Sequence, residues 1–381
     1  MRIETLLVHA GEPQPRIERA VAMPVFQSST FVEAGDTGYH DVEYARLSNT
    51  PNHLALHAKL AALEGAEAGL VTSSGMSAIS TSLLSVLGTG DHLLAQDTLY
   101  GGTHDLLTRD LPRLGISTSF VDPQDPASWE GKLRPTTRAL YVETLTNPLL
   151  QMADLPAAVA FARAHGLVSI IDNTFASPLG FRPIAHGFDL SLHSATKYLN
   201  GHNDLIAGAV LGSSALVEAV KHKLDHLGGS LDPHACFLLH RGVKTLAVRF
   251  RQQSESALRI AHFLAGHGAV ARVNHPGLPS HPQHERAARL LSSGRMGGML
   301  SFEMRGGKEA AGAFLPRMRV PLHAPSLGGP ETLVTRPAAT SHAGLSAEQR
   351  RALGISDALV RMSVGLESAE DLLEDLAQAL G

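Results

Sequence analysis

The chain is organised around the stretch Asp189-Leu-Ser-Leu-His-Ser-Ala-Thr-Lys197-Tyr-Leu-Asn-Gly-His202. It begins with the alternation of apolar and polar residues that is typical of a strand. It continues into a polar turn that carries Ser194, Thr196 and Lys197. A lysine in the same turn as two hydroxyls, directly after a strand, suits an amine that holds an aldehyde as a Schiff base while the hydroxyls bind a phosphate. The alternative is a surface lysine in a polar loop, so this stretch must be weighed with the rest of the chain.

A second apolar run, Leu167-Val-Ser-Ile-Ile-Asp172, ends in a carboxylate. Ligands of parallel α/β sheets bind outside the carboxyl ends of the strands. An aspartate placed there can pair with the pyridinium nitrogen of pyridoxal 5'-phosphate (PLP). The alternative is that Asp172 caps the turn that follows it, a common role for aspartate. Together, Asp172 and Lys197 fit the two ends of one pyridoxal ring.

Strands and helices alternate along the first two thirds of the chain. The pattern predicts strands at 69–72, 91–96, 118–121, 138–143, 167–172, 189–193 and 207–212, and helices at 52–63, 79–87, 154–165 and 232–264. This alternation predicts a mostly parallel sheet with helices on both faces. The turn Ser74-Gly75-Met76, between a strand and a helix, predicts a phosphate seat at the helix N-terminus. A last strand at 298–304 and a helix from about 368 are expected near the C-terminus.

Further motifs follow one another along nearly the whole chain. They are Val25-Phe-Gln-Ser-Ser-Thr-Phe31, Ser74-Gly75-Met76, Leu99-Tyr100-Gly-Gly-Thr, Glu143-Thr-x-x-Asn147-Pro, Asp172-Asn-Thr-Phe, His193-Ser-x-Thr-Lys-Tyr-Leu-Asn-Gly-His202, Ser326-Leu-Gly-Gly-x-Glu-Thr and Arg361-Met-Ser-Val-Gly-Leu-Glu. With these motifs in this order, the chain resembles the Cys/Met-metabolism, or trans-sulfuration, family of PLP-dependent enzymes. Within that family it looks most like cystathionine γ-synthases and γ-lyases.

The resemblance implies an α/β fold of PLP fold type I, the aspartate-aminotransferase-like fold. In this fold a large domain contains a mostly parallel sheet, and a smaller α+β domain lies at the C-terminus. We expect residues 1–50 to form an N-terminal arm that contributes to the neighbouring subunit. The PLP-binding large domain is expected at 51–245 and the small domain at 246–381. The resemblance also implies a homotetramer, a dimer of dimers with shared active sites.

The resemblance assigns roles to individual residues. Lys197 would bind the cofactor aldehyde and move protons, Asp172 would pair with the ring nitrogen, and Tyr100 would stack on the ring. The residues implied to bind the cofactor are Tyr44, Arg46, Ser74, Gly75, Met76, Tyr100, Asp172, Ser194, Thr196 and Lys197, with Tyr44 and Arg46 reaching the neighbour's phosphate. The residues implied to bind the substrate are Asn147, Ser326 and Arg361, with Arg361 holding the α-carboxylate as a bidentate pair.

The motifs do not separate β-elimination, γ-elimination and γ-replacement. The substrates implied are cystathionine, homocysteine or an O-acyl-homoserine, and cystathionine β-lyase and methionine γ-lyase remain alternatives. An aminotransferase and a non-catalytic relative are further alternatives. Many relatives carry Glu directly before the Ser-Leu-Gly-Gly motif, where it meets the distal ammonium of cystathionine. Here that position is Pro325, which argues against a strict cystathionine γ-lyase.

The composition excludes several kinds of binding partner and site. The 381 residues are 44% hydrophobic and 18% charged, with a net charge of −4, so no polybasic surface for nucleic acid or an anionic membrane is expected. The single cysteine, Cys236, excludes an intrachain disulfide and is expected to be buried. There is no run of transmembrane length and no signal-peptide pattern, which leads us to expect a cytoplasmic protein. The 21 histidines lack metal-ligand spacing, so no metal site is expected.

Overall fold

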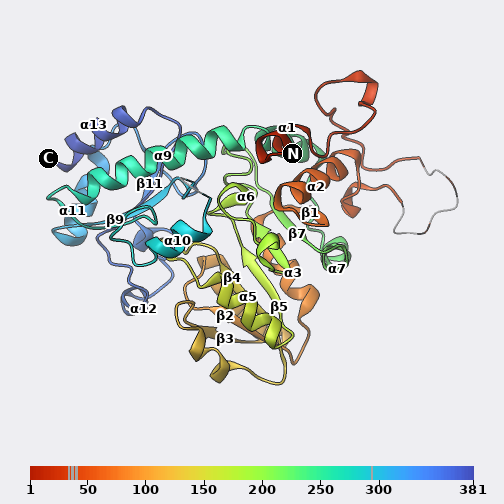
Figure 1. Ribbon diagram of the computed structural model, residues 1–381, viewed down its shortest axis with the longest axis horizontal. Coiled ribbons are helices and arrows are strands. Elements are labelled where there is room, and N and C mark those ends of the chain that lie inside the picture. The colour runs from red at the N-terminus through yellow and green to blue at the C-terminus, as the bar shows by residue number, and fades with distance from the viewer. Residues whose placement is uncertain (33–34, 36–37, 39–41, 293–294) are drawn as a thin grey trace.

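The computed structural model describes residues 1–32, 35, 38, 42–292 and 295–381. It contains two sheets, a larger one built from the first part of the chain and a smaller one from the last part (Figure 1). In Figure 1 the C-terminal helix lies at the left-hand end of the molecule, whereas the N-terminus lies right of its centre. The site described below lies between the two sheets, and it takes residues from both of them.

The large sheet has seven strands in the order β1-β7-β6-β5-β4-β2-β3. The strands are β1 Ala68–Thr72, β2 His92–Gln96, β3 Ser117–Val121, β4 Thr137–Glu143, β5 Val168–Asp172, β6 Leu190–His193 and β7 Gly208–Gly212. Five of them, from β3 to β6, pair in parallel, whereas β7 runs antiparallel to both of its neighbours. The prediction of a mostly parallel sheet is therefore confirmed.

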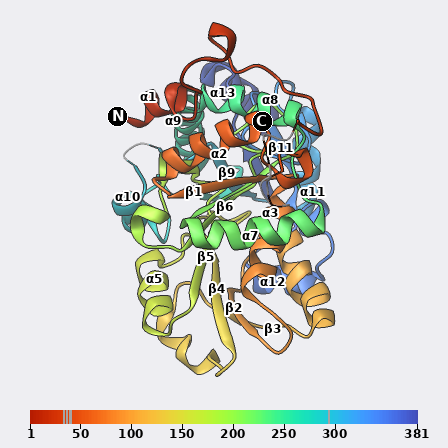
Figure 2. The ribbon, with the colours of Figure 1, turned by 90° about the vertical axis from the view of Figure 1, so that its right-hand side faces the viewer.

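Helices cover both faces of this sheet because its central strands are apolar on both sides. Along β2, Leu93 and Ala95 belong to the core beneath α3 (Gly75–Val86) and α7 (Ser214–Leu227), whereas Leu94 belongs to the core beneath α5 (Leu155–Ala164). Successive side chains of a strand point to opposite faces, so a fully buried strand reads as an apolar run. Figure 2 shows α7 and α5 on different sides of the sheet.

Some helices of the large-sheet region begin at polar caps. The helices not yet given are α1 Ile3–His9, α2 Pro51–Glu64, α4 Gly101–Asp105, α6 Ser177–Gly180 and α8 Pro233–Val243. The side chains of Ser74, Asp154, Ser213 and Asp232 accept backbone N–H groups at the starts of α3, α5, α7 and α8. Such caps satisfy N–H donors that have no partner within the helix, and each typically stabilises a helix by about 1 kcal/mol.

The small sheet has the order β10-β11-β12-β9-β8 and is mostly antiparallel. Its strands are β8 Val270–Asn274, β9 Met299–Met304, β10 Leu322–His323, β11 Leu333–Thr335 and β12 Leu359–Ser363, and its helices are α10 His284–Leu290, α11 Gly307–Phe314, α12 Ala347–Ala352 and α13 Ala369–Leu380. One apolar core joins β9 and β12 to α11 and α13, with the rings of Phe302 and Phe314 meeting edge to face.

The helical region predicted at 232–264 is two helices, α8 and α9 (Leu246–Ala265). Lys244 and Thr245 separate them, and the Thr245 hydroxyl donates to the carbonyl of Gly242. Arg249 is buried at this break and donates to the carbonyls of Tyr198 and Gly242. This break lies next to the domain boundary that the sequence predicts between residues 245 and 246. The domain boundary itself remains a prediction.

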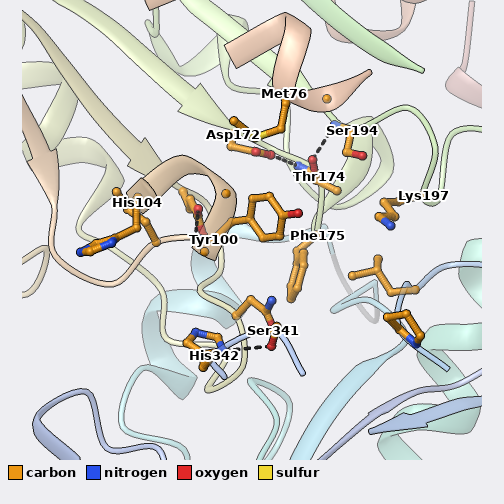
Figure 3. A pocket seen from close by; sticks show the side chains of 18 of the residues that line it. Met76, Tyr100, His104, Asp172, Thr174, Phe175, Ser194, Lys197, Ser341 and His342 are labelled. Atoms are coloured by element: carbon orange, nitrogen blue, oxygen red, sulfur yellow. Dashed lines mark hydrogen bonds between the residues drawn. The ribbon is translucent and has the colours of Figure 1, made fainter. Parts of the chain in front are cut away.

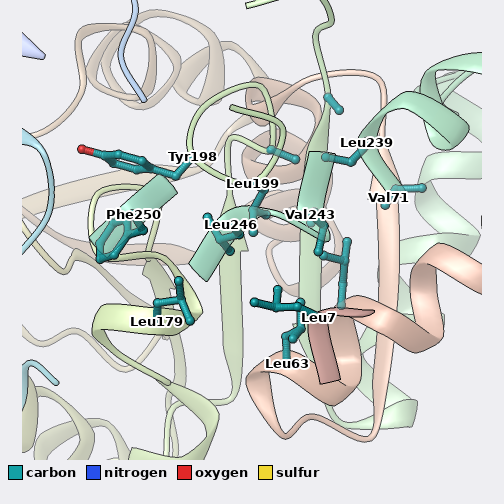
Figure 4. Packing of buried hydrophobic residues seen from close by; sticks show 14 of the residues in the cluster. Leu7, Leu63, Val71, Leu179, Tyr198, Leu199, Leu239, Val243, Leu246 and Phe250 are labelled. Atoms are coloured by element: carbon teal, nitrogen blue, oxygen red, sulfur yellow. The ribbon is translucent and has the colours of Figure 1, made fainter. Parts of the chain in front are cut away.

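α9 belongs to the cores of both sheets. Its first residues, Leu246 and Phe250, pack in the core of the large sheet (Figure 4), whereas Ile260 and Leu264 pack in the core of the small sheet. A single helix of 20 residues therefore connects the two parts of the molecule.

The N-terminal segment is less irregular than its prolines and glycines predict. It begins with α1, whose Leu7 is 1% exposed and packs in the same core as Leu63 of α2 (Figure 4). The buried amine of Lys59 donates to the carbonyl of Leu7, and Lys59 also lies 3.7 Å from Glu12. Part of the predicted arm lies outside the described residues, and its contribution to a neighbouring subunit stays a prediction. In the described ranges, no helix combines the length and apolar character needed to cross a membrane.

Candidate active site

A cavity of about 770 Å³ opens between the two sheets. Its lining includes the residues at the carboxyl ends of β4 and β5, the turn after β6, and Arg361 of β12. Most residues that the sequence predicts for the site line this one cavity: Ser74, Gly75, Met76, Tyr100, Asn147, Asp172, Ser194, Thr196, Lys197, Ser326 and Arg361. Figure 3 shows several of them converging from separate elements.

One end of the cavity is rich in hydrogen-bond donors. Ser74 caps α3, its side chain accepting the N–H of Ser77, and the N-terminal backbone of α3 faces Ser194. A Cβ on Gly75 would lie 2.8 Å from the Cβ of Ser194, so only glycine permits this approach. The Thr196 hydroxyl lies close by but exchanges hydrogen bonds with the backbone of Ala207. Helix-end amides beside hydroxyls fit a phosphate group.

Asp172 lines the cavity at the end of β5. Its carboxylate accepts the N–H of Thr174, and the Thr174 hydroxyl in turn accepts the N–H of Ser194 (Figure 3). Thr174 thus links the aspartate to the donor-rich end. Burial raises the pKa of Asp172, while the hydrogen bonds of Thr174 and the charge of His193 act in the opposite direction.

His193 is held in place by a buried carboxylate. Its Nε2 lies 2.6 Å from Glu64, and both side chains are 1% exposed. The hydroxyl of Ser191 also donates to Glu64. When it carries a proton, a histidine held beside a carboxylate in this way favours the ionised form of Asp172, which is the form that pairs with a protonated ring nitrogen.

Lys197 reaches the cavity from the turn after β6. Its Nζ donates to the hydroxyl of Ser326 over 2.7 Å, a contact that spans the two parts of the chain. Burial lowers the pKa of Lys197 to about 8, and the charge of Arg361 acts in the same direction. Ser326 adopts a φ of +99°, which is rare for a residue with a side chain and costs about 1–3 kcal/mol. The fold retains this strain at the residue that meets the lysine.

Arg361 is 5% exposed and belongs to the small sheet. It donates to the Oδ1 of Asn147 over 3.1 Å and to the carbonyl of Ser326 over 3.0 Å. Its Nε is buried and has no hydrogen-bond partner among the described residues, so the guanidinium retains an unused donor. A planar, permanently charged fork of this kind suits a carboxylate.

Tyr100 precedes α4 and is 45% exposed at the cavity. A Cβ on Gly102 would lie 2.7 Å from the Tyr100 ring, so the ring lies against this glycine. The backbone N–H of Tyr100 donates to Glu143 over 2.7 Å.

Several cavity residues were not assigned a role from the sequence. These are chiefly Asp97, Glu143, Thr174, Phe175, Ser341 and His342. Glu143 stands in one of the quoted motifs and ends an apolar strand, which is the same signal that indicated Asp172. The loop with Ser341 and His342 carries no comparable signal, since it follows a short strand in the least regular part of the chain.

Tyr44 and Arg46 are not brought to this cavity. They lie on either side of Ala45, where a short 3-10 helix begins, and Arg46 donates to the carbonyl of Asp225 in α7. The Arg46 guanidinium lies 5.5 Å from the centroid of the Tyr44 ring. Within the described part of the chain, no group of three or more histidine, cysteine or acidic residues could hold a metal ion.

The hydrogen-bond donors at one end of the cavity, the carboxylate of Asp172 and the amine of Lys197 fit pyridoxal phosphate. Comparisons with known proteins point to the same cofactor. The profile of the family described as "Cys/Met metabolism PLP-dependent enzyme" matches residues 4–381. A cystathionine γ-lyase of Bacillus subtilis (strain 168) is 43% identical over 100% of this chain and 99% of its own. A cystathionine β-lyase of Lactococcus lactis subsp. cremoris is 40% identical over 99% and 98%.

The fold agrees as well. A crystal structure of cystathionine γ-lyase from Lactobacillus plantarum, complexed with L-serine, superposes with a TM-score of 0.94 at 38% identity, covering 100% of this chain and 98% of that one. This confirms the predicted PLP fold type I. Because the family profile, the relatives and the fold cover the chain from end to end, the protein belongs to the Cys/Met-metabolism family of PLP-dependent enzymes.

Proposed function

We propose that this enzyme breaks the carbon–sulfur bond of a sulfur amino acid, with cystathionine or homocysteine as substrate. The observation that carries the proposal is the hydrogen bond between Lys197 and Ser326, which stand in one cavity with Asp172 and Arg361. The relatives reported above are named for γ-lyase and β-lyase activity. Replacement on an O-acyl-homoserine uses the same residues and is the other outcome that our experiment detects.

In this proposal the cofactor is held at two ends. Ser74, Gly75, Met76, Ser194 and Thr196 bind its phosphate, and Asp172 pairs with its ring nitrogen. Tyr100 supplies an aromatic face at the cavity. When bound, PLP supplies an aldehyde for the Lys197 amine and a pyridinium ring that takes up the electron pair left on the substrate Cα.

In this proposal the Nζ of Lys197 accepts protons from the substrate and donates them. Because its pKa is lowered to about 8, a fraction of the amine is neutral near pH 7.5 and can accept a proton from the substrate Cα. The hydroxyl of Ser326 fixes the Nζ on the side of the cavity next to Arg361. The same Nζ can then give a proton to the leaving sulfur. For a sulfur on Cγ it must also take a proton from Cβ, because the electron pair left on Cα expels only a group on Cβ.

Arg361 and Asn147 orient the substrate. The guanidinium binds the α-carboxylate while Asn147 keeps the fork from rotating. Since Arg361 belongs to the small sheet and Lys197 to the large one, substrate binding requires both.

We further propose a homotetramer built from dimers in which Tyr44 and Arg46 serve the neighbour's site. Their position outside this chain's own cavity supports it. We propose a cytoplasmic location. The single cysteine, which is buried, supports a reducing compartment.

The test incubates the purified holoenzyme separately with cystathionine, homocysteine, methionine and O-acyl-homoserines, the last with cysteine present, and repeats each incubation with 2-oxoglutarate. It measures pyruvate, 2-oxobutanoate, cystathionine and glutamate. We expect 2-oxobutanoate from cystathionine or homocysteine, and none from the Lys197→Ala control. Cystathionine formed from an O-acyl-homoserine and cysteine would instead identify a synthase. Glutamate formed from a keto acid, without elimination products, would overturn the proposal in favour of an aminotransferase.

A further inference from the structure

The cavity contains a second buried carboxyl group beside Asp172. Glu143 ends β4 as Asp172 ends β5, and the two residues are register partners in neighbouring parallel strands. Both line the cavity, and Glu143 is 5% exposed. Glu143 has no part in the roles proposed above for the cofactor and the substrate.

Hydrogen bonds tie Glu143 to the start of α4 and to the neighbouring strand β2. Its Oε1 accepts the backbone N–H of Tyr100 over 2.7 Å, while its own N–H donates to the side chain of Gln96. Tyr100 stands immediately before α4, and its ring is seated against Gly102. The glutamate fixes the backbone of Tyr100, and the glycine leaves room for its ring.

The surroundings stabilise a negative charge better on Asp172 than on Glu143. Asp172 has the N–H of Thr174 and the charge of His193, which is itself paired with Glu64. Among the described residues, no cationic side chain forms an ion pair with Glu143. Two neighbouring buried carboxyl groups do not both ionise readily, and the better supported one takes the charge. Burial raises the pKa of Glu143 well above its usual range, and the charge of Asp172 adds to this effect.

We propose that Glu143 is a positioning residue that acts as a neutral carboxylic acid. It holds the Tyr100 backbone at the cavity through its carbonyl oxygen, and it leaves Asp172 as the ionised group at the ends of these two strands. The proposal rests on the roles proposed above for Tyr100 and Asp172. The proposal predicts that the activity of the enzyme depends on the acceptor oxygen of the Glu143 side chain and not on a negative charge there.

The test compares Glu143→Gln with Glu143→Ala. Glutamine keeps an oxygen that accepts the Tyr100 N–H and is uncharged, so we expect kcat/KM within about threefold of the wild type and an unchanged acid limb of the pH profile. Alanine removes the acceptor, and we expect kcat to fall by about tenfold or more because Tyr100 is no longer fixed. A loss in the glutamine variant as large as that in the alanine variant would overturn the proposal.

A second measurement does not depend on turnover. The infrared spectrum of the apoprotein at neutral pH should contain the carbonyl stretch of a protonated carboxyl group. We expect this band to be absent from Glu143→Gln and retained in Asp172→Asn. A band that persists in Glu143→Gln, or no such band in the wild type, would overturn the proposal even if the alanine variant fails to fold. If the wild type shows this band but turns over none of the substrates, the result would count against the proposed function and not against the role of Glu143.

Discussion

Lys197 combines two environmental effects that act on one amine. Burial and the charge of Arg361 both disfavour its protonated form, while Ser326 accepts a hydrogen bond from it. Its reactivity therefore depends on pH in a range where an ordinary lysine would be fully charged.

The first prediction follows from this lowered pKa. As pH rises through about 8, Lys197 loses its proton, so the rate at which the apoprotein captures PLP should increase and level off above that pH. An ordinary lysine, with a pKa of about 10.4, would still be gaining reactivity at pH 9. Borohydride reduction at each pH, followed by peptide mapping, measures the adduct. An adduct on another lysine, or a midpoint near 10, would contradict the site proposed here.

Pro325 also lines the cavity and has no charge to offer a substrate. We predict that Pro325→Glu raises the preference for cystathionine over homocysteine, which lacks the distal amine. A charge-assisted contact contributes roughly 1.5–3 kcal/mol, or about ten- to a hundredfold in kcat/KM. The measurement is the ratio of the two kcat/KM values, with Pro325→Gln as the uncharged control. An unchanged ratio in a variant that still binds PLP would show that the distal group is recognised elsewhere.

At the scale of elements, the site depends on how closely the start of α3 approaches the turn after β6. We predict that Gly75→Ala weakens PLP binding by roughly tenfold or more, because the added methyl group overlaps Ser194. The control is Gly131→Ala, since a Cβ at Gly131 would meet nothing within 4 Å. Equilibrium titration of the two apoproteins with PLP measures the difference. Equal affinities would mean that the phosphate is bound elsewhere.

The sequence predicts these elements to different extents. The strands that end in Asp172 and His193 are apolar runs followed by polar groups, a pattern typical of buried parallel strands that end at a site. β12 was not predicted, because its centre is Arg361, and arginine is rarely buried. The role of Glu143 was also hidden, since its partner Tyr100 is 43 residues away and the contact goes to a backbone N–H. Because every residue except proline has a backbone N–H, the sequence does not indicate which of them Glu143 contacts.

At the scale of the whole molecule, two residues proposed to bind the cofactor lie apart from the others. Tyr44 and Arg46 lie beside α7, away from the cavity that contains Lys197. If they serve a neighbouring subunit, two inactive variants can complement each other within one dimer.

We therefore predict that a mixture of Arg46→Ala and Lys197→Ala proteins regains activity after subunit exchange, because one site of a mixed dimer is then intact. Activity is compared with that of each variant alone. Native mass spectrometry of the two variants, one of them isotope-labelled, establishes that mixed dimers form. Mixed dimers without activity would count against sharing.

The path of α9 through two hydrophobic cores has a mechanical consequence. Its first turns pack in the core of the large sheet and its last turns in the core of the small sheet, so unfolding of either core removes contacts from the same helix. We therefore expect the two cores of the apoprotein to melt together in calorimetry, and two separate heat-absorption peaks would show that they unfold independently in spite of the shared helix. Because Arg361 lies in the part that the last turns of α9 support and Lys197 in the part that its first turns support, a shift of one part against the other would change the distance between these two side chains.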